Sequence, residues 1–233
     1  MLLFFDCETT GLEDVERICS IGFITQNTTA FELIKPPRKI RPDASAVHHI
    51  TNEMVVDQKT FRDCNSVKQL QSCNTSEATL ISHNIAFDLN MLQKEGFVWQ
   101  GGIVDTLKCT RRLIPECEQY ALQFLRYELK LYRHETDVAK TLGIALNAHN
   151  ALSDALHVKL LYEYLLEMAS HEQLVEQSME HVLIVKFAFG KYKGRYIEEI
   201  AMSDPGYLRW MLGNMFDMDD DLRYSVEYYL SQV

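Results

Sequence analysis

The chain has 233 residues, of which 47% are hydrophobic and 24% charged, which is typical of a globular protein with one large core or two unequal domains. No stretch reaches the roughly 20 uninterrupted apolar residues of a membrane helix, and no signal-peptide pattern opens the sequence. We therefore expect a cytoplasmic protein with no membrane partner. The formal net charge of -10 excludes binding of nucleic acid by attraction over the whole surface. Any phosphate ligand must meet a local basic patch, metal ions, or both.

The first third of the chain is predicted to form strands. Short apolar runs separated by glycine or polar turns lie at residues 2–5, 18–25 and 30–34. Such close spacing favours an antiparallel meander. Further helices are expected at residues 44–55 and 61–70, and further strands at 78–82 and 103–105. Strands followed by interleaved helices indicate an α/β domain with a mixed sheet flanked by helices.

The polar, glutamate-rich segment 171–181 is predicted to be a linker between two domains. The first domain then covers residues 1–170, and a small C-terminal module of the α+β class covers residues 182–233. The module begins with a strand-like run, "VLIVKFAF", and Asp204 with Pro205 forms a good helix start. The six cysteines form no C-x-x-C pair, which argues against a zinc site or a disulfide framework.

Two acids follow the first strand. Asp6 and Glu8 are two residues apart, so in an extended chain their side chains point the same way, while Cys7 points to the other side. Taken alone, such a pair is more often a solvated strand end than a binding site.

Two later acids lie on helix faces that should be apolar. In a helix over residues 86–95, Asp88 shares its side with Met91 and Leu92, and in the helix that follows residue 150, Asp154 shares its face with Leu161. Burial of an unpaired carboxylate costs several kcal/mol or shifts its pKa until it is neutral. Acids aimed inward from separate segments therefore need a common explanation.

Convergence of Asp6, Glu8, Asp88 and Asp154 on divalent cations supplies that explanation. Ligand sets made only of oxygen favour Mg²⁺ or Mn²⁺ over zinc. Two such ions roughly 3.5–4 Å apart can activate water and stabilise both oxygens of a phosphoryl displacement. The sequence therefore predicts metal-dependent hydrolysis of phosphodiesters. His149, five residues before Asp154, is the candidate base for the attacking water, although a lone histidine is more often solvated or hydrogen-bonded.

The motifs "DCETTGL", "HNIAFD" and "HNALSDA", in this order and spacing, resemble those of the DEDDh superfamily of 3′ to 5′ exonucleases. The resemblance covers about residues 1–170 and implies a ribonuclease H-like domain. It implies that Asp6, Glu8 and Asp154 bind the first metal, that Asp6 also bridges to a second, and that Asp88 supports the second through water. His149 would be the general base.

The C-terminal sequence "FGKYKGRYIEEIAMSDPGYLRWML" is similar to that of the exodeoxyribonuclease X family. Its basic residues alternate with aromatic ones, a composition that suits phosphate contacts and base stacking. We therefore take Lys191, Lys193 and Arg195 as candidate DNA contacts. A hairpin with an aromatic core and solvated lysines is the equally favoured alternative.

Further candidate substrate contacts lie beside the acidic motifs. Thr9, Gly11 and Leu12 follow the first acid pair; Gly11 permits a tight turn, and Leu12 could wedge against a terminal base or pack within its loop. His83 and Asn84 could orient the acid of the next helix or the phosphate, and Asn84 could instead cap that helix.

We therefore expect a 3′ to 5′ exodeoxyribonuclease that hydrolyses DNA from 3′ ends with two metal ions and a histidine base, in DNA repair or end processing. An exoribonuclease or oligonucleotide-degrading relative and a polymerase proofreading subunit are alternatives within the enzyme class. A catalytically inactive nucleic-acid-binding module is the alternative from another class.

Overall fold

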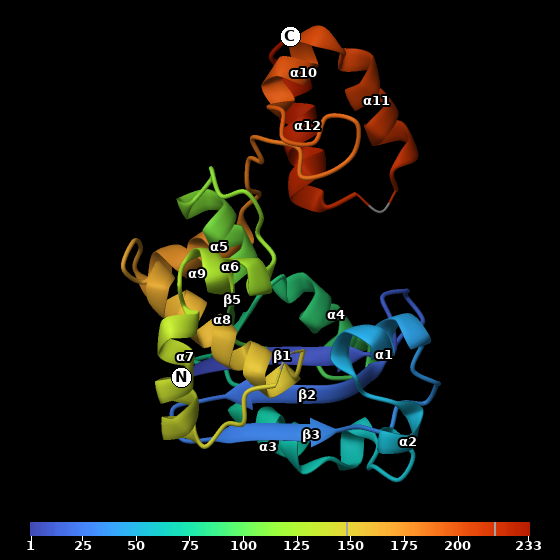
Figure 1. The fold of residues 1–233 in the computed structure, drawn as a ribbon, viewed down its shortest axis with the longest axis vertical. Coiled ribbons are helices and arrows are strands. Elements are labelled where there is room, and N and C mark those ends of the chain that lie inside the picture. The colour runs from blue at the N-terminus through green and yellow to red at the C-terminus, as the bar shows by residue number, and fades with distance from the viewer. Residues whose placement is uncertain (148, 217) are drawn as a thin grey trace.

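A mixed sheet forms the centre of the larger part of the protein (Figure 1), with strand order β3-β2-β1-β4-β5. The computed structural model describes residues 1–147, 149–216 and 218–233. The strands are β1 (Leu2–Thr9), β2 (Ile18–Ile24), β3 (Thr29–Leu33), β4 (Thr79–Ser82) and β5 (Gly102–Asp105). β1, β2 and β3 pair antiparallel, whereas β4 and β5 continue the sheet in parallel. The predicted meander and mixed sheet are confirmed.

The central strand β1 is apolar on both faces, which explains its position. Leu3 and Phe5 belong to the core on one face of the sheet, and Phe4 belongs to the core on the other. Strands covered on both sides read as continuous apolar runs rather than as alternating ones. β1 extends to Thr9, so Asp6 and Glu8 lie within the strand and not beyond its end.

Helices cover both faces of this sheet. On the side of Leu3 and Phe5 the core includes α3 (Asn65–Cys73) and α4 (Ile85–Lys94), and on the side of Phe4 it includes α8 (Ala151–Leu165). The other helices of this part are α1 (Pro42–His48), α2 (Asn52–Val55), a 3-10 turn (Phe61–Asp63), α5 (Thr106–Leu113), α6 (Leu122–Glu128), α7 (Tyr132–Leu142) and α9 (His171–Met179). Within the described residues, every helix is too short or too polar to cross a membrane.

The first turn of α8 lies directly on the sheet at Gly22. Gly22 of β2 is paired with Asp6 of β1. A Cβ atom at Gly22 would lie 2.2 Å from the amide nitrogen of Leu152 and 2.3 Å from the carbonyl carbon of Ala151. Only glycine permits this approach, which brings the start of α8 next to the acids of β1.

The segment 171–181, expected to be a linker, is instead mostly the helix α9. Ser170 and Gln173 form a capping box that starts this helix. Its Leu174 is fully buried, and its Ser178 accepts a hydrogen bond of 2.8 Å from the amide of Asp105 on the sheet. Buried Leu174 and Ser178 thus anchor to the sheet a helix in which most of the other side chains are polar.

The C-terminal module is helical, not α+β. It contains α10 (Ile197–Ser203), α11 (Pro205–Asn214) and α12 (Asp220–Ser231), with a single β-bridge between Lys186 and Tyr196 among its described residues. The expected strand at residues 182–189 does not form, since the amides of Val182 and Ile184 donate to the side chains of Asp221 and Ser225 on α12. The expected helix start at Asp204 and Pro205 is present.

Candidate active site

Three of the sequence-predicted acids form one cluster. Oxygens of Asp6, Glu8 and Asp154 all lie within 4.8 Å of one another. β1 supplies the first two from one face, and α8 supplies Asp154 from its first turn. The side chain of Asn150 caps α8 by accepting from the amides of Leu152 and Ser153.

Burial and mutual repulsion make Asp6 and Glu8 hard to ionise. Burial first, and then the charges of the neighbouring acids, Asp88 foremost, raise the pKa of Asp6 well above its usual range. Burial, followed by the charges of Asp154 and Asp88, raises the pKa of Glu8 to about 8. Close carboxylates of this kind require protons or a cation to offset their charge. The donors are all carboxylate oxygens, which suits hard divalent cations.

Asp88 lies outside that cluster. Its two oxygens accept hydrogen bonds from the Ser82 hydroxyl at 2.5 Å and the Cys7 thiol at 3.1 Å. The alternation of β1 accounts for this, because Cys7 belongs to the core that contains α4. Burial raises the pKa of Asp88 to about 7, although the hydrogen bonds from Ser82 and Cys7 oppose the increase. Asp88 therefore lies beside the three-acid cluster, close enough to raise the pKa of Asp6, with both of its oxygens engaged by Ser82 and Cys7.

A polar network that the sequence did not reveal holds Asp154. Gln123 of α6 donates a hydrogen bond of 2.6 Å to Oδ1 of Asp154, and the imidazole of His157 lies 3.3 Å from the same oxygen. His157 also lies 3.3 Å from Glu135, which forms two hydrogen bonds of 2.6 Å with Arg126. The sequence feature that could have revealed this network is Glu135, an acid that lies on the buried face of α7 together with Ala139. Three helices thereby fix one candidate metal ligand.

His149 lies just before α8, and its backbone adopts a positive φ of 51°. It is half-buried and near His48, whose pKa is lowered first by burial and also by the charges of His49 and His149. His48 is itself held by the amide of Ile50 at its Nδ1 atom, while its Nε2 atom lies 3.1 Å from the carbonyl of Thr9. His48 therefore supports the loop after β1.

The loop after β1 presents Leu12 to solvent. Leu12 is 85% exposed, and the Thr9 hydroxyl donates a hydrogen bond of 2.7 Å to the carbonyl of Gly11. Glu16 anchors this loop. Its side chain is fully buried, accepts a hydrogen bond from the Thr10 hydroxyl and forms an ion pair with Arg38 at 3.2 Å. The packed-loop alternative for Leu12 does not apply.

The described hydrogen bonds of His83 and Asn84, which precede α4, go to residues other than Asp88. The His83 ring contacts the Thr106 hydroxyl at 3.0 Å and the carbonyl of Tyr120 at 2.7 Å, and burial lowers its pKa to about 4. Asn84 precedes α4 in a left-handed conformation, without a side-chain cap, and its amide donates to Asp105. The described hydrogen bonds of Asp88 come from Ser82 and Cys7 and from neither of these two residues. Asp105 caps α5 by accepting hydrogen bonds from the amides of Leu107 and Lys108.

The basic candidates of the C-terminal module differ in their contacts. Lys191 pairs with Asp204 at 3.1 Å, and Arg195 pairs with Glu199 at 3.1 Å. Lys193 has no carboxylate partner among the described residues. These groups lie on the module, whereas the acid cluster lies on the sheet of the larger part (Figure 1).

The sheet order and the acid cluster define a nuclease domain of the exonuclease type, and family comparison agrees. The chain belongs to the exonuclease family, whose model matches residues 3–162. The exodeoxyribonuclease X-like C-terminal family matches residues 187–216. The chain is thus a nuclease that hydrolyses phosphodiester bonds, and members of its family use divalent metal ions.

Full-length and partial relatives support this assignment. The chain is 30% identical to exodeoxyribonuclease 10 of Escherichia coli over 99% of both chains. It is 32% identical to the DNA polymerase III subunit epsilon of Treponema pallidum, over 63% of this chain and 76% of that one. The fold is similar to that of an exonuclease X in complex with 5′ overhanging duplex DNA, with a TM-score of 0.54, 24% identity, and coverage of 76% of this chain and 99% of that chain.

Proposed function

We propose that the chain is a 3′ to 5′ exodeoxyribonuclease that uses two Mg²⁺ or Mn²⁺ ions to release nucleotides from the 3′ ends of single- or double-stranded DNA. The convergence of Asp6, Glu8 and Asp154 within 4.8 Å carries this proposal. We place the enzyme in the cytoplasm, in DNA repair or end processing. Its six cysteines are all free, which suits a reducing compartment.

Each residue of the site then has a role. Asp6, Glu8 and Asp154 hold the metal, and Asp88, held by Ser82 and Cys7, acts through water. Bound divalent ions supply an activated water and charge stabilisation for the phosphate. His149 takes the proton of the attacking water.

The substrate contacts proposed from the sequence extend from this centre. Thr9 and Gly11 shape the loop, and Leu12, exposed at its tip, packs against the terminal base. His83 and Asn84 act on the substrate site only indirectly, by positioning the segment that leads into α4. Lys193 is the strongest candidate for a DNA contact on the module, since Lys191 and Arg195 already have carboxylate partners.

DNA is favoured over RNA by the relatives that share both parts of the chain. The name of the E. coli relative, which matches over 99% of its length, specifies DNA as its substrate. The proofreading alternative is weaker, because the resemblance to the polymerase subunit covers 63% of this chain, whereas the resemblance to the E. coli exodeoxyribonuclease covers 99%. An inactive binding module has no use for a cluster of mutually repelling acids of which one is buried and two are partly buried.

Time courses on 3′-labelled single-stranded DNA, duplex DNA and RNA of equal sequence test the proposal, with Mg²⁺, with Mn²⁺ and with chelator. We expect metal-dependent loss of the label from DNA and little from RNA. Asp154→Asn should abolish the reaction, whereas Glu163→Gln, on the exposed side of the same helix, should not. Equal rates of label release by Asp154→Asn and by the unaltered protein would contradict the proposal.

A further inference from the structure

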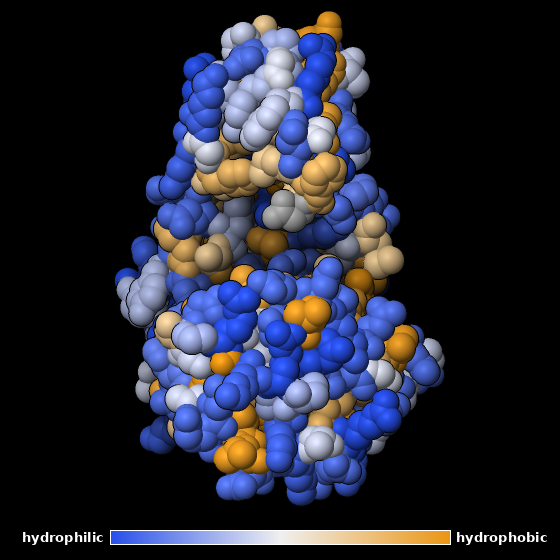
Figure 2. All heavy atoms as spheres, turned by 90° about the vertical axis from the view of Figure 1, so that its right-hand side faces the viewer, coloured by the Kyte–Doolittle hydropathy of each residue, from blue (hydrophilic) through white to orange (hydrophobic). Residues whose placement is uncertain are grey.

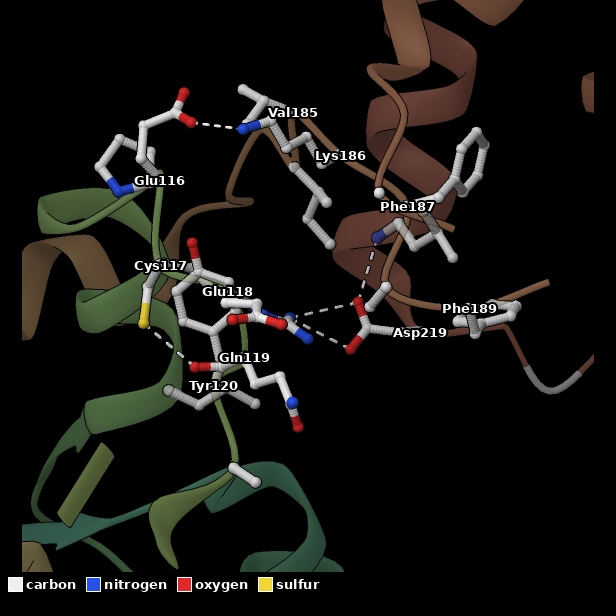
Figure 3. Close-up of a pocket in the computed structure, with 18 of the residues that line it drawn as sticks. Glu116, Cys117, Glu118, Gln119, Tyr120, Val185, Lys186, Phe187, Phe189 and Asp219 are labelled. Carbon is white, nitrogen blue, oxygen red and sulfur yellow. Dashed lines mark hydrogen bonds and ion pairs between the residues drawn. The ribbon is translucent and has the colours of Figure 1, made fainter. Parts of the chain in front are cut away.

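A cleft of about 750 Å³ separates the nuclease domain from the C-terminal module. Figure 2 shows the hollow between the two parts, with apolar residues gathered around it. One wall is the end of α5 and the loop 115–121, and the other is the segment 183–189 with residues of α12 (Figure 3). Cavities of this size accommodate one small organic ligand or a short part of a polymer chain.

The cleft borders the segment that leads into α4. His83 and Asn84 line its floor. Asn84 directly precedes α4, and Asp88 lies one turn further along that helix. The segment that enters α4 therefore links the cleft to the helix that carries Asp88, and a strand bound at the acid cluster would have to extend several nucleotides to occupy the cleft.

The charges that line the cleft largely cancel one another. Lys186 pairs with Glu116 across the cleft at 2.5 Å, and Arg111 pairs with Asp219 at 3.2 Å, again between the two parts. Among the described residues, Lys193 is the lining cation that remains without a carboxylate partner. Glu118 is a lining carboxylate without a cation partner among the described residues, so the cleft offers one available positive charge, on Lys193, beside one unpaired negative charge, and not a broad basic surface.

Aromatic surface accompanies that lysine. Phe189 lines the cleft and is 44% exposed, in contrast to Phe187, which is buried in the core of the module. Figure 3 shows the Phe189 side chain on the module side, beside Asp219. An exposed ring near an unpaired cation is the arrangement that binds single-stranded nucleic acid, by stacking a base and contacting a phosphate.

We propose that this cleft binds an unpaired nucleotide of the substrate strand, on the 5′ side of the nucleotide that is being released. Its base stacks on Phe189, and its phosphate contacts Lys193. This inference rests on the proposed function, and it gives the module a specific role, which is to hold the strand while the nuclease domain removes its end. The nearly neutral lining fits one flexible strand better than it fits a duplex, whose two backbones need many cations.

Binding of oligothymidylates to the full chain tests this site without turnover, in the Asp154→Asn background. The probes are a dinucleotide and a strand of about 16 nucleotides, the upper end of known single-strand sites. Phe189→Ala and Lys193→Gln should each weaken binding of the long strand about tenfold, and should weaken binding of the dinucleotide less. Phe31→Ala and Lys140→Gln, which alter exposed residues of the nuclease domain, are the matched controls and should bind both probes like the parent.

A second measurement locates the strand directly. Photo-crosslinking with 5-iododeoxyuridine a few positions from the 3′ end should modify the peptide that contains Phe189. Equal long-strand affinity for the cleft and control variants, or crosslinks confined to the nuclease domain, would overturn the inference. So would tighter binding of oligouridylate RNA than of DNA. Hydrolysis of the dinucleotide by the unaltered protein tests the proposed function separately, because that probe is too short to reach the cleft.

Discussion

Gln123 Nε2 donates a hydrogen bond of 2.6 Å to Oδ1 of Asp154, so a residue of α6 fixes the carboxylate that α8 contributes to the acid cluster. Partners that orient metal ligands commonly change metal affinity about 10- to 100-fold when they are removed. We expect Gln123→Leu to weaken Mn²⁺ binding within that range, as measured by calorimetry. Gln119→Leu, in the exposed loop before α6, is the control. Unchanged affinity in Gln123→Leu would show that the neighbouring His157 alone positions the carboxylate.

His149→Ala tests the proposed base. Removal of a general base commonly lowers the rate by about 100- to 10,000-fold. We expect kcat to fall within that range at saturating Mg²⁺ and the rise of kcat with pH in the unaltered enzyme to flatten in the variant. His134→Ala alters an exposed histidine of α7 and should leave both quantities unchanged. A variant with the same kcat and pH profile as the parent would assign the base elsewhere.

The raised pKa of Glu8 predicts an unusual pH dependence of stability. Glu8 has a usual value of 4.5, which applies to the unfolded chain, and a pKa of about 8 in the folded, metal-free protein. Between these values the folded protein keeps a proton that the unfolded chain has released. The free energy of unfolding should therefore decrease as the pH rises from about 4.5 to about 8. Asp88, whose pKa is raised to about 7, acts in the same direction.

Urea unfolding in chelator at several pH values measures this effect. Glu8→Gln should make the decrease of the unfolding free energy with pH shallower. Glu163→Gln, on the solvent-exposed face of α8, should leave that decrease unchanged. Added Mg²⁺ should stabilise the protein more at about pH 8 than at about pH 5, because the ion competes with protons for the same oxygens. Identical slopes for Glu8→Gln and the parent would mean that Glu8 titrates normally.

Gly22→Ala tests the contact between α8 and the sheet. The added methyl group would force the start of α8 to move by about 1 Å, since its Cβ would lie 2.2 Å from the Leu152 nitrogen. We expect a loss of about 1–3 kcal/mol in the free energy of unfolding and a loss of about 100-fold in activity. Gly213→Ala has no atom within 4 Å of its new Cβ and should retain activity. Thermal unfolding and initial rates measure both effects.

The sequence predicted those parts of the fold that local patterns determine. Strand β1 followed from its apolar run, and the inward positions of Asp88 and Asp154 followed from helical periodicity. The helix α9 was missed because its segment is polar, and a single buried leucine gives little periodic signal. The strand expected at residues 182–189 was wrong because its amides bind side chains of α12, which are about 40 residues away in sequence.

The candidate site was predictable in its membership but not in its geometry. Three acids gather as the motifs implied, yet Asp88 lies apart because Cys7 and Ser82 hold it from the other side of β1. Which acids come within reach of one ion depends on strand alternation and on helix placement together. The support that Gln123 gives to Asp154 depends on the packing of α6 against α8, and no motif in either segment records it.

Gly22 contributes no atom to the acid cluster, but it determines how far apart the acids of the strand and the acid of the helix lie. The spacing of the proposed metal ligands therefore depends on a van der Waals contact between the helix layer and the sheet, and the acids occupy the gap that results. Attempts to retune the enzyme toward a larger or smaller ion can therefore begin at this contact, with every carboxylate left in place.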